Sequence, residues 1–126
     1  MIRLKYYSVE DVHFAMENTR LDRKRALLPD GEKFNYTSQR LRLFKEKGLT
    51  CVTCGIEGSV YIFETHNLET VPHLNLYALN GDNKLVLMTK DHIQPKSKGG
   101  ANAHENYATM CSPCNEAKAD KLPGEA

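Results

Sequence analysis

The chain has 126 residues, of which 40% are hydrophobic and 26% are charged, and its formal net charge is +1. These proportions are typical of a single globular domain and exclude a wholly disordered chain. No apolar run approaches the ~20 residues that a membrane-spanning helix requires, and the first residues lack the apolar core of a secretory signal. We therefore expect a soluble, cytoplasmic protein that does not bind a membrane.

The positive charge is unevenly distributed along the chain. Residues 20–47 contain nine Lys or Arg and four acidic residues, whereas residues 48–126 contain six Lys or Arg and nine acidic residues. A basic segment beside an acidic remainder suits a partner with a phosphate backbone. A solvated helix face would explain the same charges, so the charge pattern alone leaves both interpretations open.

The first elements are two predicted helices separated by a turn. Ser8 can cap a short helix, because an acidic residue follows three positions later. Pro29-Asp30-Gly31 marks a turn. A second helix begins at Thr37 or Ser38, carries a stripe of large apolar residues, and ends at Gly48. This part of the chain is predicted to be helical and basic.

The four cysteines form two C-x-x-C pairs, Cys51 with Cys54 and Cys111 with Cys114. In an intracellular chain this pattern indicates a tetrahedral zinc site, because two thiolates on a tight knuckle can face one ion and two knuckles complete its ligands. A site closed by four thiolates is structural and performs no chemistry. Other metals, redox chemistry or four free thiols are the remaining explanations.

Three strands are predicted between the cysteine pairs. Residues 59–65 are rich in β-formers, and residues 73–79 alternate apolar and polar side chains. Asn80-Gly81-Asp82-Asn83 predicts a hairpin turn in which Asn and Gly take positive φ. Residues 84–89 would return as the second arm of this hairpin.

A motif follows the last of these strands. In chain order its residues are Asp91-His92-Ile93, Pro95, Ser97, Gly99-Gly100, Asn106, Cys111, Cys114, Asn115 and Lys118. With these residues the chain resembles the HNH endonucleases, also called ββα-metal or His-Me finger nucleases, over roughly residues 49–120. It is most similar to the four-cysteine type, in which a zinc knuckle holds the ends of the ββα unit together. Small proteins of this kind are often phage-encoded.

The side chains of the motif suit phosphodiester hydrolysis. His92 can act as general base, because the unperturbed imidazole pKa of ~6.5 suits proton abstraction near neutrality. Alternation along a strand should point Asp91 and His92 to different sides, whereas the resemblance implies a bend that brings both to one site. The resemblance implies that Asp91 and Asn115 hold Mg²⁺ or Mn²⁺, and that Asn106 braces the loop that orients the base.

One position departs from the name of the family, because Asn115 stands where the third residue of the pattern is commonly His. An amide oxygen is an acceptable ligand for Mg²⁺, but the change weakens the case for Ni²⁺ or Zn²⁺ as the catalytic ion. Cationic side chains near the motif and on the second helix could contact phosphates, although solvation at the surface would also explain them. These candidates for nucleic-acid binding are Arg40, Arg42, Lys45, Lys96, Lys98 and Lys118.

The sequence thus predicts an α+β fold. A short helical, basic region, residues 1–48, would precede a second region, residues 49–126, that contains the ββα-metal unit with its hairpin insertion and its four-cysteine zinc site. The predicted function is metal-dependent endonuclease, nicking or cutting double-stranded DNA, as a homodimer or within a larger nuclease or packaging machine. The alternatives are a non-cleaving zinc-stabilised module that binds nucleic acid or protein, and a redox or zinc-relay protein.

Overall fold

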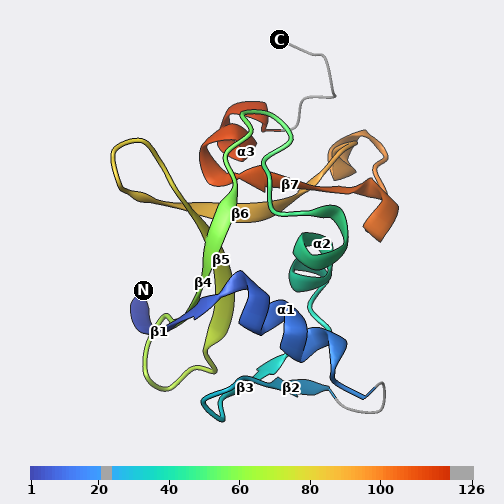
Figure 1. Cartoon of the computed structure of the whole chain (residues 1–126). Helices are drawn as coiled ribbons and strands as arrows, with labels where there is room; N and C mark the ends of the chain where they lie inside the picture. Colours follow the sequence, from blue (N-terminus) through green and yellow to red (C-terminus); the bar gives the residue numbers. More distant parts are fainter. Residues whose placement is uncertain (21–23, 120–126) are drawn as a thin grey trace.

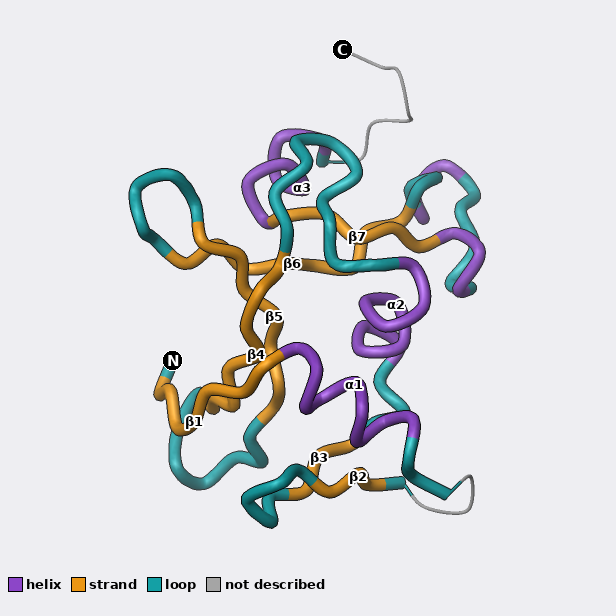
Figure 2. Tube along the Cα trace, viewed as in Figure 1, coloured by secondary structure: helices purple, strands orange, loops and turns teal. Residues whose placement is uncertain are grey.

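The computed structural model describes residues 1–20 and 24–119 and has a mixed α+β architecture (Figures 1 and 2). Its main sheet has five strands in the order β1-β4-β5-β6-β7, each antiparallel to its neighbour. The strands of this sheet are β1 (Ile2–Ser8), β4 (Gly58–Thr65), β5 (His73–Leu79), β6 (Leu85–His92) and β7 (Tyr107–Cys111). A separate hairpin pairs β2 (Arg25–Leu27) with β3 (Lys33–Asn35).

Three α-helices lie in the described ranges: α1 (Val9–Glu17), α2 (Gln39–Lys47) and α3 (Ser112–Lys118). Short 3₁₀ turns, η1 (Lys96–Lys98) and η2 (His104–Asn106), lie in the loop between β6 and β7. Among these helices none has the length and apolarity to span a membrane.

Both predicted helix starts in the N-terminal part are confirmed. The Ser8 side chain accepts a hydrogen bond from the Asp11 N–H at 3.0 Å, and the Ser38 side chain accepts one from the Leu41 N–H at 3.4 Å. The second helix ends at Gly48, whose φ of +107° is easily reached only by glycine. The two serine caps satisfy backbone donors that the first turn of each helix leaves without partners.

The N-terminal part also contains strands that the sequence pattern did not predict. β1 pairs with β4 along the edge of the main sheet, and the β2–β3 hairpin surrounds the predicted turn at residues 29–31. In β1 only Tyr7 is buried, so an apolar alternation that would indicate a strand is weak. Through β1, the N-terminal part therefore shares a sheet with the C-terminal part.

The hairpin turn after β5 differs from the predicted one. Asn83, and not Asn80 with Gly81, takes the left-handed conformation, with φ of +59°. The Asn83 N–H donates to the Asn80 carbonyl at 3.0 Å, and the Asn80 side chain accepts from the N–H groups of Asp82 and Lys84. The hydrogen bonds of Asn80 thus stabilise a longer loop, which forms in place of the predicted two-residue turn.

One hydrophobic core joins the helices to the sheet. Its most buried large side chains, each at most 1% exposed, are Val12, Leu28, Leu43, Phe44, Tyr61, Leu76 and Met88. α1 and α2 lie along one side of the sheet, and α3 lies beside β6 and β7 (Figure 1). The core therefore fixes α2 relative to β6 and β7, the two strands that carry the motif.

We expect Leu43→Ala to lower the free energy of unfolding by about 2–5 kcal/mol, because it leaves a cavity at a fully buried position of α2. Leu27→Ala is the matched control, since Leu27 is 60% exposed on β2 and its truncation should cost far less. Urea unfolding of both variants measures the difference. Equal losses would contradict this placement of the core.

Candidate active site and metal centre

The four cysteines converge on one point. Their Sγ atoms all lie within 4.8 Å of one another, and Cys54 Sγ is 3.7 Å from Cys111 Sγ. A tetrahedral ion with bonds of ~2.3 Å to sulfur would separate its ligands by about 3.8 Å. None of the four forms a disulfide. The predicted cluster is therefore confirmed as a set of thiols positioned to bind a metal ion.

The first knuckle is built by backbone hydrogen bonds to Cys51. The N–H groups of Thr53 and Cys54 point at Cys51 Sγ at 3.4 and 3.5 Å, and the Gly55 N–H donates to the Cys51 carbonyl. Gly55 turns the chain with φ of +83°. The Val52 N–H donates to the Thr109 carbonyl at 3.0 Å, which ties the knuckle to β7 and so to the second cysteine pair.

The thiols have different pKa values. Burial raises the pKa of Cys51, but the backbone N–H groups around its sulfur outweigh burial and lower that pKa to about 6. At Cys114 the hydrogen bond with Cys111, together with burial, raises the pKa to about 12. Four adjacent thiolates repel one another, and a divalent cation relieves that repulsion. The chemistry of this donor set therefore fits a metal ion.

Asp91 and Asn115 lie between β6 and α3. The Asp91 carboxylate is buried, and the Lys118 ammonium of α3 lies 2.6 Å from it and also contacts the His92 carbonyl. One turn earlier in α3, the Asn115 amide nitrogen donates to Thr89 Oγ1 at 2.9 Å. Since Thr89 and Asp91 point to the same face of β6, the two predicted ligands lie on one side of this strand.

His92 points away from that face. Its Nε2 is 2.8 Å from Asn102 Oδ1, and its ring packs edge-on against Tyr107, with 5.1 Å between the ring centroids. Tyr107 also contacts Gln39 of α2. The His92 ring therefore lies on the side of the paired strands β6 and β7 that faces α2. The described residues show no contact between the His92 ring and the side chains of Asp91 or Asn115. Strand alternation therefore holds at this position, and the side chains of Asp91 and His92 lie on opposite faces of β6.

Asn106 closes the loop after His92. Its side chain accepts from the Gln94 N–H and donates to the carbonyls of Gln94 and Ala101, at 2.9 to 3.0 Å. At Gly100 any Cβ would lie 1.8 Å from the Gln94 carbonyl oxygen, so the chain can make this close approach only with glycine. This placement supports the bracing role that the resemblance implies.

The predicted phosphate-binding cations have different surroundings. Arg42 pairs with Glu46, and Lys45 pairs with Glu17, each at 3.2 Å. Arg40 is partly buried and donates to the Leu74 carbonyl. Lys96 and Lys98 are exposed on η1. These five assignments stay predictions, and the contacts of α2 weaken the case for its three residues.

The assignment of Lys118 also stays a prediction, and it is weakened because the ammonium lies against Asp91 and the side chain is 16% exposed. Sequence reasoning also missed Thr89, Asn102 and Tyr107. Of these, Thr89 could have been found, because alternation on β6 places it on the Asp91 face.

The comparison with protein families agrees with this motif. The family model of HNH endonucleases matches residues 80–126. This range covers β6, the braced loop, β7, α3 and the second cysteine pair, and it leaves the N-terminal part and the first pair outside. No curated protein and no solved structure matches the chain. Residues 80–126 are therefore similar to the HNH endonucleases, the family that the motif indicated.

Proposed function

We propose that this protein is a metal-dependent endonuclease that hydrolyses phosphodiester bonds in DNA. The observation that carries the proposal is the end of β6, where a buried carboxylate faces α3 and the next residue is a histidine held by a braced loop. This arrangement lies within the segment that matches the HNH endonucleases. A scissile phosphate at the strand end would be accessible to both side chains.

The residues at β6 and α3 fit Mg²⁺ or Mn²⁺. Asp91 and Asn115 offer a carboxylate and an amide oxygen, and hard cations are commonly held by one or two such ligands together with substrate phosphates. The Asp91 carboxylate already has a cation against it, the ammonium of Lys118. The Asn115 amide nitrogen donates to Thr89 Oγ1, and no described residue donates a hydrogen bond to Asn115 Oδ1. When bound, the ion would neutralise charge on the phosphate and the leaving oxygen.

His92 would take the proton from the attacking water. If Asn102 Oδ1 accepts from Nε2, the proton of the neutral ring lies on Nε2, and Nδ1 is the free base. The edge-on contact with Tyr107 fixes the plane of the ring. Asn106 would act indirectly. Its three hydrogen bonds fix the loop that contains Asn102, and Asn102 in turn orients His92.

The four-cysteine site would hold structural Zn²⁺ and take no part in hydrolysis. Double-stranded DNA is the proposed partner, bound mostly through its phosphates. One active site cuts one strand, so cutting both requires two sequential nicks, a homodimer or a larger machine.

A second candidate function is a module that binds nucleic acid or protein without cleaving. The ion pair between Asp91 and Lys118 favours it, because an ammonium that stays on the carboxylate would exclude a metal ion. The redox alternative has less support, since the four sulfurs match a metal site rather than a disulfide pair.

We expect His92→Ala to lower the rate of supercoiled-plasmid cleavage in Mg²⁺ or Mn²⁺ by roughly 10²–10⁴-fold, because the water loses its base. His66→Ala is the matched control, since His66 is exposed and lies outside the motif. Gel assays of nicked and linear plasmid measure both rates. If the wild type leaves plasmid intact in both metals while fully loaded with zinc, the non-cleaving module becomes the better assignment.

Lys118→Met tests whether the ammonium and the metal compete for Asp91. Because the substitution removes the charge and keeps the length of the side chain, we expect Mn²⁺ to bind roughly tenfold more tightly. This corresponds to a gain of about 1.4 kcal/mol in binding free energy. Calorimetric titration without DNA measures the affinity, and Lys84→Met, at an exposed lysine, is the control. Unchanged or weaker binding would place the ion elsewhere.

Cys54→Ser removes one of the four sulfur ligands. We expect zinc content to fall below one ion per chain and Tm to drop by roughly 10 °C, which corresponds to about 2 kcal/mol. Elemental analysis and thermal unfolding measure these quantities. Thr53→Ser changes the same knuckle but keeps all four sulfurs, so it should retain zinc; a loss of zinc in both variants would implicate the loop rather than the ligand.

A further inference from the structure

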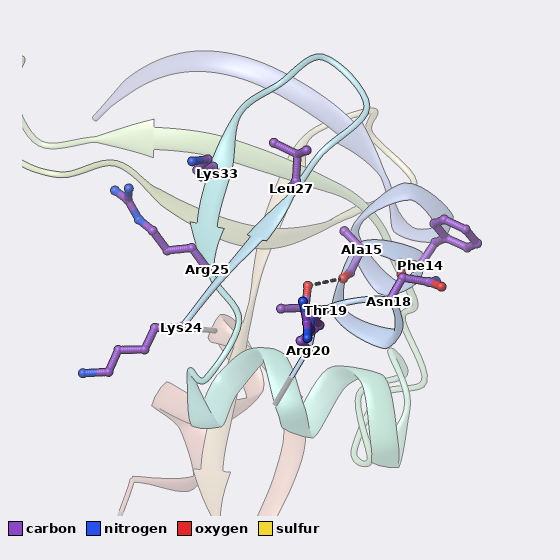
Figure 3. A pocket seen from close by; sticks show the side chains of 9 residues that line it. All are labelled: Phe14, Ala15, Asn18, Thr19, Arg20, Lys24, Arg25, Leu27 and Lys33. Atoms are coloured by element: carbon purple, nitrogen blue, oxygen red, sulfur yellow. Dashed lines mark hydrogen bonds between the residues drawn. The ribbon is translucent and has the colours of Figure 1, made fainter. Parts of the chain in front are cut away.

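A hollow with a volume of about 480 Å³ lies between the end of α1 and the β2–β3 hairpin (Figure 3). Four of the side chains that line it are cationic: Arg20, Lys24, Arg25 and Lys33. The remaining lining residues are neutral. We call this feature the N-terminal basic hollow.

Strand alternation creates the basic side of the hollow. In β2, Arg25 and Leu27 are exposed while Ala26 between them is buried, and in β3, Lys33 is exposed while Phe34 is buried. Leu27 and Lys33 are directly opposed across the hairpin. The core side of this small sheet thus fixes which residues face outward, and two of these outward residues are the cations Arg25 and Lys33.

The end of α1 forms the opposite wall. The Asn18 side chain donates to the Phe14 carbonyl at 2.8 Å, and the Thr19 hydroxyl donates to the Ala15 carbonyl at 2.7 Å. These bonds satisfy the last carbonyls of the helix and hold the wall in place. Phe14 is 66% exposed on this wall, across the hollow from Lys24, Arg25 and Lys33 (Figure 3).

The cations of the hollow differ from those of α2 in their partners. Arg42 and Lys45 are paired with Glu46 and Glu17. Within residues 1–20 and 24–119, the four cations of the hollow make no ion pair. Like charges gathered without a counter-ion repel one another, and a polyanion would relieve that repulsion.

The shape of the cluster distinguishes between anions. The side chains of Lys24 and Arg25 extend outward from the hairpin and do not converge with Arg20 on one point (Figure 3). A single small anion needs convergent donors, whereas a row of phosphates is matched by cations spread along a surface. The exposed ring of Phe14 can pack on the apolar sugars between phosphates.

We propose that the N-terminal basic hollow binds the sugar-phosphate backbone of nucleic acid at a site separate from the active site. The β2–β3 hairpin lies at the end of the molecule opposite α3 and β7 (Figure 1). A duplex that reaches both regions would be held at two places, and the distant contact would fix its direction across β6. This inference rests on the proposed nucleic-acid substrate and adds a surface outside the segment that matches the nuclease family.

The test compares two double variants on the His92→Ala background, which keeps the DNA intact. Arg25→Gln/Lys33→Gln removes two charges of the hollow, and the control, Arg25→Lys/Lys33→Arg, keeps both charges at the same positions. Fluorescence anisotropy with a labelled duplex, at several salt concentrations, gives the Kd and its salt dependence. We expect the first variant to bind roughly tenfold more weakly, with a log–log salt slope shallower by about 2. The control should change neither quantity by as much.

Equal Kd values and slopes in the two double variants would overturn the inference, and so would a parent protein that binds no duplex. The nuclease proposal fails separately, through plasmid cleavage. A protein that never cleaves but loses affinity in the hollow variant would support the surface without the enzyme. A protein that cleaves but binds equally well in both variants would support the enzyme without the surface.

Discussion

The convergence of the four cysteine sulfurs is the constraint on which the site depends. α3 has seven residues, Ser112–Lys118, and a helix of that length does not persist alone in water. Cys111 and Cys114 bind its first turn to the knuckle of Cys51 and Cys54, and the hydrogen bond from Val52 to Thr109 secures the same joint. A bound ion would therefore set the position of α3 over β6, although it lies outside the chemistry.

Charge balance at Asp91 follows from that position. Burial of a carboxylate is costly unless a cation or hydrogen-bond donors compensate it. Lys118 on the last turn of α3 supplies the cation at 2.6 Å. A metal ion that binds the same carboxylate must either bind beside the ammonium of Lys118 or displace it. The same ion pair thus stabilises the folded helix and sets how strongly a metal must bind.

Local patterns predicted those features that local physics determines. The bounds of β5 agree with the alternation of residues 73–79, and both N-terminal caps agree with their sequence signals. β1 was missed because an edge strand buries little and leaves only a weak alternation. The motif identified residues of the segment that matches the HNH endonucleases, but it could not show that Lys118 turns inward, since that depends on how α3 packs on β6.

The cations of residues 20–47 show most clearly what the sequence alone cannot predict. The excess of cations in residues 20–47 is visible in the sequence, but a sum of charges does not reveal which cations are already paired. The structure divides the segment into α2, where Arg42 and Lys45 have acidic partners, and the hairpin, where Arg25 and Lys33 have none in the described chain. Glu46 and Glu17 lie four and 28 positions from their partners, so only the first pair follows from helix geometry. Because a paired cation has less charge to offer a phosphate, we expect a polyanion to be attracted most strongly to the hairpin, which lies at the end of the molecule opposite α3 and β7.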